Sequence, residues 1–447
     1  MSTATQTTED YLVRYSEPDA RLREVAATLP LHESLRESIS GRVFGRPLFV
    51  DRAEIDQVTT DAIRVFDLIV SLPNRLFGGD LFAFCAAIRV DPRLVPSLLR
   101  GYGSEPVVRY GRADLYHDGK AFRLLEFNID SEIGGLSSAS ELPRLFAENE
   151  YFREFAGGRD LSFTQPTERL AEALRQLAAP LSGGRDPVVA LLQMDAPVPG
   201  QEDYHNRRSL EQIMRGFGLD FRFDTIGGVT ESGGRLHHRG DPVDVVLRGF
   251  SAYHIMTKPG GRQLTEPLFR VAEQDGVAIW TPLYSQLFIN KTCLAYLSDP
   301  RYSRHFSSEE LAVIDRVVPW TRALRPDVEP TEEPWLLDKD ELILKPSFQY
   351  GGAGIVAGWE CDNQTWISAL RKCAPEGAIV QRRVVPREEP MFNPTSGKRE
   401  NWKAVWGLFV TPAGYAGLRA RLVTESASSV ISFATDGQTR VAPVFTV

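Results

Sequence analysis

The sequence predicts a mixed α/β (α+β) protein with a helical N-terminal region. Three observations support this fold class. Residues 1–100 carry apolar side chains at helical spacing, residues 188–280 alternate between short apolar strands and helices, and the segment after residue 341 is rich in strands. At 447 residues the chain has room for about two to four domains with a real hydrophobic core.

The composition is that of an ordinary globular protein, with 43% hydrophobic and 25% charged residues. The net charge of −8 argues against a general nucleic-acid binder. The chain lacks a run of about eighteen apolar residues and starts with the polar stretch MSTATQTTEDY, so we expect neither a transmembrane helix nor a signal peptide. The four cysteines show no CxxC spacing, which disfavours a zinc site or a disulfide framework and makes the cytoplasm the expected location.

The N-terminal region shows one clear helical stripe, made of Val58, Ala62, Val65, Ile69 and Leu72. These positions fall on one face of a helix, and Pro73 directly after them is expected to end it. Nothing in residues 1–100 suggests chemistry, so we interpret this region as scaffold.

Residues 110–136 contain the pattern on which the functional prediction centres. RADLYH and FRLLEFNI are expected to form two strands joined by the Asp-Gly turn HDGK. Glu126 and Asn128 leave one face of the second strand, and the hairpin can bring Asp114 opposite them. Two carboxylates and an amide on one face suit Mg²⁺. A solvated hairpin face is the alternative, but an acid inside an apolar strand is costly unless it is paired.

The hairpin runs into the small-residue loop SEIGGLSS, which precedes a helical stretch. Gly134 and Gly135 would let the backbone approach an anion, with free N–H groups at the start of the helix. A plain turn is an equally good interpretation.

The alternation of strands and helices begins after a boundary expected in the polar segment 157–186. The expected strands are VVALLQM (188–194), VDVVLRGF (243–250) and VAIW (277–280). Strands that alternate with helices predict a parallel α/β layer of roughly 100 residues. Arg248 stands at the C-terminal end of its strand, where open α/β sheets bind ligands, although a surface cap is the alternative.

Two lysines stand beside predicted strands. Lys291 follows the strand-like LYSQLFI, and a Pro-rich connection further on marks a second expected boundary. Lys345 ends a short apolar strand, and SFQYGGAG then turns back into a second strand. A glycine-rich turn of this kind can cover polyphosphate, because glycines let the backbone close over the oxygens while the lysine supplies charge. An ordinary glycine hairpin is the alternative.

The last part of the chain reads as more strands. GAIVQRRVVP (377–386) is an apolar strand interrupted by Gln381, Arg382 and Arg383. Such a strand can offer backbone groups to an adenine edge, and an edge strand with charged gatekeepers is the alternative. A meander follows, on which Arg419 and Arg421 share one strand face.

Together these pieces resemble the ATP-grasp ligases, specifically their circularly permuted branch. That branch includes glutathionylspermidine synthetase-type enzymes and amino-acid ligases of natural-product biosynthesis. In ordinary ATP-grasp proteins the metal strand, with its D…E-x-N pattern, closes the chain. Here RADLYHDGKAFRLLEFN precedes the lysine and the glycine loop, which is the permuted order. The resemblance covers about residues 105–447 and implies an ATP-grasp fold.

The resemblance implies an ATP site with Mg²⁺ (or Mn²⁺). Its metal ligands would be Asp114, Glu126 and Asn128. The two lysines on the nucleotide phosphates would be Lys291 and Lys345. The loop that covers the phosphates would contain Gly351, Gly352 and Gly354.

The resemblance also implies the adenine hinge and the groups around the reacting carboxylate. The hinge would involve Gln381, Arg382 and Val384, with Glu388 or Glu389 as the ribose contact. The hinge reads QRRV and departs from relatives that carry an acid first. Arg112 resembles the arginine that steadies acyl-phosphate oxygens, and the arginines that could hold a substrate carboxylate are Arg112, Arg248, Arg419 and Arg421.

The domain order implied by the resemblance starts with the helical region 1–100. Residues 101–165 would form the metal-binding part of the ATP-grasp C-lobe, and 166–300 a pre-ATP-grasp-like α/β domain. Residues 301–390 would form the N-lobe with the glycine loop, and 391–447 the remainder of the C-lobe.

The implied activity is ligation of a carboxylic acid, such as an amino acid or small peptide, to an amine or a carrier-protein thiol. ATP would be consumed through an acyl phosphate, with ADP as product. No nucleic acid or membrane partner is expected, and a homo-oligomer is compatible with the sequence. Two alternatives stay open: a phosphotransferase on the same fold, and a nucleotide-binding regulator without turnover.

Overall fold

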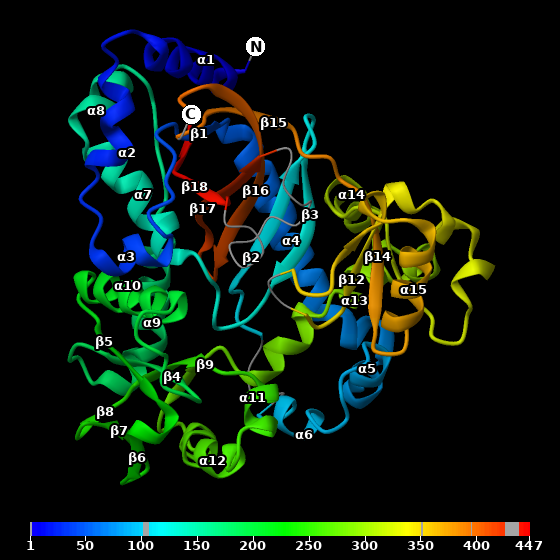
Figure 1. Cartoon of the computed structure of the whole chain (residues 1–447). Helices are drawn as coiled ribbons and strands as arrows, with labels where there is room; N and C mark the ends of the chain where they lie inside the picture. The colour runs from blue at the N-terminus through cyan, green and yellow to red at the C-terminus, as the bar shows by residue number, and fades with distance from the viewer. Residues whose placement is uncertain (1, 102–106, 350–351, 395, 425–437) are drawn as a thin grey trace.

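The structure is a computed structural model, and it describes residues 2–101, 107–349, 352–394, 396–424 and 438–447. Figure 1 shows a central sheet, a second sheet below it on the left in green, and a third on the right in yellow and orange. The first helices of the chain lie at the upper left and behind the central sheet. The predicted fold class, a mixed α/β protein with a helical N-terminal region, is confirmed.

The central sheet joins strands from two distant parts of the chain in the order β18-β17-β16-β2-β3, with β15 also paired to β16. Its strands are β2 (Gly111–His117), β3 (Phe122–Asn128), β15 (Glu388–Phe392), β16 (Arg399–Thr411), β17 (Gly414–Thr424) and β18 (Arg440–Ala442). Antiparallel pairing of β2 with β16 places the early hairpin beside the C-terminal meander, at one edge of the same sheet. This is the arrangement expected when the metal-binding strands come first in the chain.

The hairpin of β2 and β3 forms as the Asp-Gly turn predicts. Asp118 accepts hydrogen bonds from the backbone N–H groups of Lys120 and Ala121, both at 2.9 Å. Gly119 adopts a φ of 91°, which an L residue rarely adopts. The turn therefore fixes the register that brings Asp114 and Glu126 together.

The parallel layer has the strand order β10-β9-β4-β5, and all of its pairings are parallel. Its strands are β4 (Val188–Gln193), β5 (Asp220–Thr225), β9 (Val245–Gly249) and β10 (Ala278–Trp280). Its helices are α9 (Pro166–Ser182), α10 (Glu202–Gly216), α11 (Ala252–Thr257) and α12 (Gly261–Ala272). The three predicted strands are confirmed, while β5 and the small sheet of β6 (Val229–Ser232), β7 (Arg235–His238) and β8 (Asp241–Pro242) were not predicted.

The third sheet has the order β11-β14-β12-β13 and is antiparallel. Its strands are β11 (Thr321–Ala323), β12 (Leu342–Pro346), β13 (Val356–Ala357) and β14 (Ala378–Arg382). The helices of this part are α13 (Thr292–Ser298), α14 (Ser308–Val317) and α15 (Asn363–Cys373). We call this part the N-lobe, and the central sheet the C-lobe.

The N-terminal region is helical, as predicted, apart from β1 (Leu48–Val50), which pairs in parallel with β19 (Val444–Thr446). Its helices are α1 (Thr3–Ser16), α2 (Val25–Thr28), α3 (Glu33–Ser38), α4 (Arg52–Phe77), α5 (Leu81–Ala87) and α6 (Val95–Leu98). The helices α7 (Leu136–Glu148) and α8 (Glu150–Ala156) follow the hairpin.

Two local expectations are wrong. The helix α4 does not stop at Pro73 but continues to Phe77, because Leu76 and Phe77 still pack on the core, and Gly78 ends it at a φ of 59°. The segment 157–186, where a boundary is expected, contains the helix α9, and the boundary stays a prediction. The strand expected at 283–289 is a 3₁₀ turn, η3 (Leu283–Ile289), buried throughout. Short runs that are buried on all sides do not distinguish a strand from a helical turn.

Among the described helices, none is by itself long and apolar enough to cross a membrane. The pair α4 and α5, bent by 108° at its break, passes that test together. Eleven residues of α4 are buried within the protein.

Candidate functional site

The predicted acid pattern forms one polar face on β2 and β3. Asp114 lies directly opposite Glu126, and Arg112 lies opposite Asn128. Residues that pair across an antiparallel ladder project to the same side of the sheet. The four side chains therefore share one face, as the two-residue spacing in each strand predicts.

The polar face continues across the sheet through Gly407. This residue of β16 lies opposite Asp114 on one side and opposite Arg419 of β17 on the other. A Cβ atom at residue 407 would lie 2.8 Å from Cδ of Arg112, so the missing side chain makes room for that arginine. A glycine inside an apolar strand is the sequence signal for such a close approach.

The two buried charges of β2 form an ion pair. The Nε and Nη2 atoms of Arg112 donate to the two carboxylate oxygens of Asp114 at 2.5 and 2.9 Å. Nη1 of Arg112 donates to the carbonyl of Gly134 at 2.6 Å, and Nη2 of Arg421 donates to Asp114 at 3.3 Å. The arginine side chains thus connect the acid face to the small-residue loop that follows the hairpin.

A bulge in the hairpin turns one carbonyl toward the N-lobe. The register passes from the pair Asp114–Glu126 to the pair Leu115–Leu124, so Leu125 has no partner on β2. Its carbonyl accepts a hydrogen bond from Nζ of Lys345 at 3.1 Å. The bulge therefore joins the C-lobe hairpin to the lysine of β12.

Both predicted lysines reach the acid face. Lys291 stands at the start of α13, and its Nζ lies 3.3 Å from a carboxylate oxygen of Glu126. The same Nζ donates to the carbonyl of Gln349 at 2.9 Å. Nζ of Lys345 donates to Oε1 of Gln381 at 2.7 Å. Lys291 thus meets the carboxylate of Glu126, while Lys345 binds the backbone directly beside it.

Burial and the neighbouring charges shift the pKa values of these groups. Burial would raise the pKa of Glu126, but the charges of Lys291, Lys345 and Arg112 outweigh it and hold this pKa at about 2. Burial lowers the pKa of Lys345 to about 8, although Glu126 acts in the opposite sense. Burial, together with the charges of Arg421 and Arg112, also lowers the pKa of Arg419. An anion placed here would favour the charged form of all these cations.

The donor set of the acid face fits a cation that is bound together with phosphate. It offers two carboxylates, Asp114 and Glu126, and the amide of Asn128, whose Nδ2 lies 3.5 Å from Glu126. In the described part of the chain, no three His, Cys, Asp or Glu side chains are grouped so that they could hold a metal by themselves. Mg²⁺ is commonly held by one or two carboxylates plus phosphate oxygens and water, so the residues present suit it.

The glycine loop connects β12 and β13, as predicted. Gly352 and Gly354 adopt φ values of 85° and 70°, and a Cβ atom at Gly354 would lie 2.9 Å from Pro346. Gly351 lies outside the described residues. The start of the loop is fixed to α13, since Oγ of Ser347 lies 2.9 Å from Oγ1 of Thr292.

The expected hinge residues lie where β14 leads into β15. Gln381 is buried, and its side chain joins Lys345 to Thr321, whose Oγ1 lies 3.1 Å from Nε2 of Gln381. The side chain of Arg382 is exposed, and Val384 is half-buried. Adenine contacts by these residues stay a prediction.

The two ribose candidates on β15 differ. Glu388 is exposed and accepts a hydrogen bond from Asn401. Glu389 is buried beside Arg46 and accepts from Nε of Arg387 at 2.9 Å. The exposed Glu388 is therefore the better placed of the two for a ligand.

Arg248 is the predicted catalytic residue that does not join this cluster. Its side chain is 1% exposed, and its guanidinium donates to the carbonyls of Thr281 and Phe250 and to the carboxylate of Asp130. Asp130 also accepts from Nε2 of Gln286 at 3.0 Å. These contacts tie the loop after β3 to the parallel layer, and ligand binding by Arg248 stays a prediction.

A pocket that the sequence did not reveal lies beside the loop 131–137. It measures about 110 Å³ and is lined by that loop, α10 and the ends of β4 and β9. Arg207 is buried there and pairs with Glu132 and with Asp203, the latter at 3.0 Å. On the other side of the loop, Gly135 packs against Arg419, since a Cβ atom would lie 2.2 Å from Nη1. The pocket therefore adjoins the arginines of the acid face.

One solved structure shares this fold, and others are more distantly similar. A glutathione synthetase-like effector from Globodera pallida has a TM-score of 0.60 at 14% identity, over 100% of this chain and 98% of that one. A putative gamma-glutamylcysteine synthetase from Methylobacillus flagellatus has a TM-score of 0.45 at 12% identity, over 89% of each chain. The ATP-grasp ligase PsnB, solved with a minimal precursor, has a TM-score of 0.29 at 11% identity, over 58% of this chain and 90% of that one.

No curated protein matches the sequence. A family model does match, and it covers residues 45–433, which span the hairpin, the parallel layer, both lysines and the glycine loop. The predicted resemblance to glutathionylspermidine synthetase-type enzymes is thereby confirmed. The chain belongs to the glutathionylspermidine synthase preATP-grasp family.

Proposed function

We propose that the protein is an ATP-dependent carboxylate–amine or carboxylate–thiol ligase that releases ADP and phosphate. Family membership supports a ligase that uses ATP. The observation that carries the proposal is the meeting of Lys291 with Glu126 at 3.3 Å and of Lys345 with the neighbouring carbonyl of Leu125 at 3.1 Å. Phosphoryl transfer depends mainly on positioning and charge neutralisation, and this arrangement supplies both.

The triphosphate would lie between the N-lobe and the acid face of the C-lobe. Lys291 and Lys345 would neutralise its charge from the N-lobe side, and the loop 347–354 would cover it. Asp114, Glu126 and Asn128 would hold Mg²⁺, which when bound neutralises phosphate charge and orients the γ-phosphate. Contacts to adenine would come from the backbone near Val384, and ribose contacts from Glu388.

The first chemical step would be attack of a substrate carboxylate oxygen on the γ-phosphorus. An O–P bond forms, the bond to the β-phosphate oxygen breaks, and ADP leaves with that electron pair. Arg112, Arg419 and Arg421 face this region and would hold the oxygens of the acid and of the transferred phosphoryl group. The lowered pKa of Arg419, caused by burial and by neighbouring arginines, indicates a cluster short of counter-charge.

The second step would be attack of the acceptor on the acyl carbon. The C–N or C–S bond forms, the acyl C–O bond to phosphate breaks, inorganic phosphate leaves, and the acceptor loses a proton. Closure of the glycine loop would keep water from the acyl phosphate until the acceptor arrives.

The pocket beside the loop 131–137 is the substrate pocket in this proposal. Arg207 offers a guanidinium to a carboxylate, while Glu132 and Asp203 offer carboxylates to an ammonium group. A zwitterion such as an amino acid or the end of a small peptide presents both charges. The amino-acid or peptide class is therefore the substrate class that we propose.

A hydroxamate-trapping screen tests this function. Purified protein is incubated with Mg-ATP, hydroxylamine and each of the twenty amino acids or a panel of small acids and peptides. Hydroxylamine captures an acyl phosphate whatever the natural acceptor is. A hydroxamate with stoichiometric ADP supports the proposal, whereas a hydroxamate with AMP would show adenylation and overturn it.

A further inference from the structure

A separate cavity of about 390 Å³ lies in the N-lobe against β11 and the 3₁₀ turns η5 (Pro330–Glu332) and η6 (Pro334–Leu337). Its volume is in the range of small-molecule sites. Its apolar wall includes Leu324, Leu336 and Ala374, which belong to the hydrophobic cluster that packs α15 onto the sheet. No function described above uses this cavity.

The cavity lies on the opposite side of the N-lobe sheet from the two lysines. Arg322 lines it and pairs across the ladder with Val380, a member of the cluster beneath α15. The preceding residue, Thr321, pairs with Gln381, whose side chain contacts Lys345. Successive residues of a strand face opposite sides, so the cavity and the ATP site are distinct.

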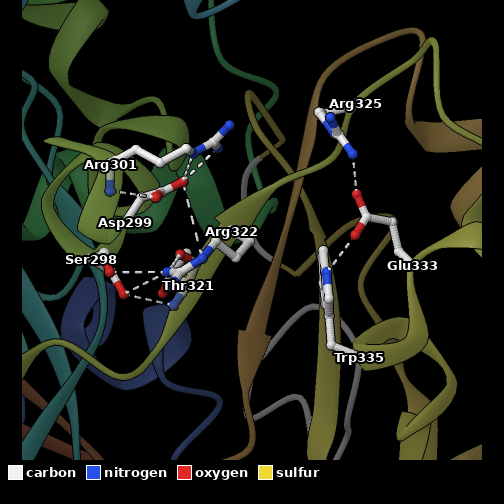
Figure 2. Close-up of polar contacts among 8 residues, drawn as sticks. All are labelled: Ser298, Asp299, Arg301, Thr321, Arg322, Arg325, Glu333 and Trp335. Carbon is white, nitrogen blue, oxygen red and sulfur yellow. Dashed lines mark hydrogen bonds and ion pairs between the residues drawn. The ribbon is translucent and has the colours of Figure 1, made fainter.

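Three arginines and two carboxylates surround the cavity (Figure 2). Asp299 pairs with Arg301 at 2.5 Å and lies 4.0 Å from Nε of Arg322. Glu333 pairs with Arg325. Figure 2 shows Asp299, Arg301 and Arg322 in one group, and Arg325, Glu333 and Trp335 in a second. The balance of these five side chains is one positive charge.

The carboxylates are already engaged, while the arginines keep unused donors. Asp299 accepts from the backbone and side chain of Arg301, and Glu333 accepts from Arg325 and from Nε1 of Trp335 at 2.8 Å. Arg322 donates through Nη1 to Ser298 and Thr321. Among the described residues, Nη2 of Arg322, Nη1 of Arg301 and Nη1 of Arg325 have no protein acceptor. Burial lowers the pKa of Arg322, and the charge of Arg301 acts in the same direction, while Asp299 opposes both.

We propose that this cavity is a second ligand site that binds a small organic anion, with an oxyanion group held by the three arginines and a flat apolar body against Trp335. Arginine presents paired N–H donors that match carboxylate and phosphate oxygens. The indole of Trp335, which packs against Trp320 with ring centroids 5.1 Å apart, and the side chains of Leu324 and Leu336 supply the apolar surface.

Two short connections join this site to the ATP site. The first is α13, which starts directly after Lys291 and ends at Ser298, the acceptor of hydrogen bonds from the backbone N–H of Thr321 and from Arg322. The second runs from Thr321 through Gln381 to Lys345, with contacts of 3.1 and 2.7 Å. A ligand bound by Arg322 therefore affects β11 and, through Ser298, the helix α13. These two elements lead to Lys345 and Lys291, so binding of the ligand should be linked to binding of ATP.

The test uses two aromatic anions of different head group, phenyl phosphate and phenylacetate, with 2-phenylethanol as an uncharged control. Binding to the full chain is measured by calorimetry with a non-hydrolysable ATP analogue present at saturation, which keeps the probes out of the ATP site. We expect one site that prefers at least one anion over the alcohol. The anion that binds more tightly identifies the natural head group as a phosphate or a carboxylate.

The variant that tests the site is R301A/R325A, in which the two removed side chains are 65% and 52% exposed, and denaturant unfolding against the unaltered chain checks that it is folded. The control is R93A, which removes a 75% exposed arginine paired with Asp91 away from the cavity. We expect the affinity for the preferred anion to fall about tenfold in R301A/R325A, which corresponds to the loss of a pair of charge-assisted hydrogen bonds. The affinity should be unchanged in R93A.

Three results would overturn the proposal: no binding of either anion, binding that the ATP analogue abolishes, or equal binding by R301A/R325A and the unaltered chain. The linkage is tested in the same samples by measuring the affinity for the ATP analogue with and without the bound anion. A change of about threefold or more is expected, and the double variant should lose it. If the unaltered chain binds the ATP analogue equally tightly with and without the anion, the linkage is refuted.

Discussion

Arg112 and Asp114 lie two residues apart on β2, and the guanidinium holds both oxygens of the carboxylate at 2.5 and 2.9 Å. Asp114 is also the carboxylate that the sequence predicts as a metal ligand. Without nucleotide, the arginine would therefore compete with a cation for Asp114. Phosphate oxygens would give Arg112 another anionic partner and release Asp114 for the metal.

Replacing Arg112 by Met should change Mg²⁺ affinity and turnover in opposite directions. Without nucleotide, Mg²⁺ affinity should rise about threefold or more because Asp114 loses its strongest partner. Turnover should fall about 100-fold because the acyl phosphate loses an oxygen ligand. Calorimetry and ADP release measure the two effects. Arg123→Met is the matched control, since it breaks an arginine–aspartate pair at the turn of the same hairpin. Unchanged Mg²⁺ affinity would refute the competition.

Glu126→Gln should abolish turnover and leave the protein folded. The change keeps the shape of the side chain but removes the charge that faces Lys291 and Lys345. We expect ADP formation to fall about 100-fold or more, because Mg²⁺ and the lysines both lose their anionic partner. Glu266→Gln, an exposed carboxylate paired with Arg100, serves as the control. Normal turnover in Glu126→Gln would indicate that ATP is consumed at a different site of the protein.

ATP binding should weaken above pH 8. The pKa of Lys345 is lowered to about 8 by burial, so the free protein loses this charge as the pH rises through 8, while bound phosphate favours the protonated form. The complex therefore holds more protons than the free protein, and affinity falls with rising pH by up to about tenfold per unit. Titrations in chelator exclude divalent cations. Lys345→Arg should flatten the profile, and an unaltered slope in that variant would assign the proton to another group.

Gly407→Ala should damage the site through Arg112. The new methyl group would lie 2.8 Å from Cδ of Arg112, and the arginine would have to leave its place over the strand. We expect a loss of about 1–3 kcal/mol in unfolding free energy, together with reduced turnover. Gly216→Ala is the control, since a methyl group there meets no atom within 4 Å. Chemical denaturation measures the unfolding free energy, and ADP release measures turnover. Equal stability and turnover of Gly407→Ala and Gly216→Ala would contradict the packing argument.

Arg248→Leu should lower stability more than substrate affinity. The substitution leaves the carboxylate of Asp130 without its arginine, and breaking such a buried pair costs about 3–5 kcal/mol. Arg270→Leu, which breaks an exposed pair with Glu231, should leave the stability nearly unchanged, because water screens such a pair. Denaturant unfolding compares the two. A raised KM for the acid with normal stability would instead make Arg248 a substrate ligand.

Local patterns were sufficient to predict much of the fold. The Asp-Gly turn and the two-residue spacing of Glu126 and Asn128 predicted the hairpin and its polar face. The run VVALLQM predicted a buried parallel strand. The segment 283–289 was predicted wrongly because it is short and buried throughout, so its pattern does not distinguish a strand from a helical turn. The helix end at Pro73 was predicted wrongly because a proline near the end of a long, well-packed helix need not end it.

The contacts within the site depend on residues that are far apart in the chain. Lys345 meets the carbonyl of Leu125 only because a bulge leaves that residue unpaired, and no sequence pattern marked the bulge. Gly407 was visible as a lone glycine in an apolar strand, which is a recognisable sign of close approach. The pairing of Arg207 with Glu132 joins α10 to the loop after β3 and left no local signal.

The most direct test of the ligase mechanism follows the oxygen of the substrate carboxylate. The acid identified by hydroxamate trapping is labelled with ¹⁸O in its carboxylate and incubated with Mg-ATP and an acceptor. Attack on the γ-phosphate predicts one ¹⁸O atom in the released inorganic phosphate and none in the nucleotide, which is recovered as ADP. Label in AMP, or product formation without label in phosphate, would contradict the account.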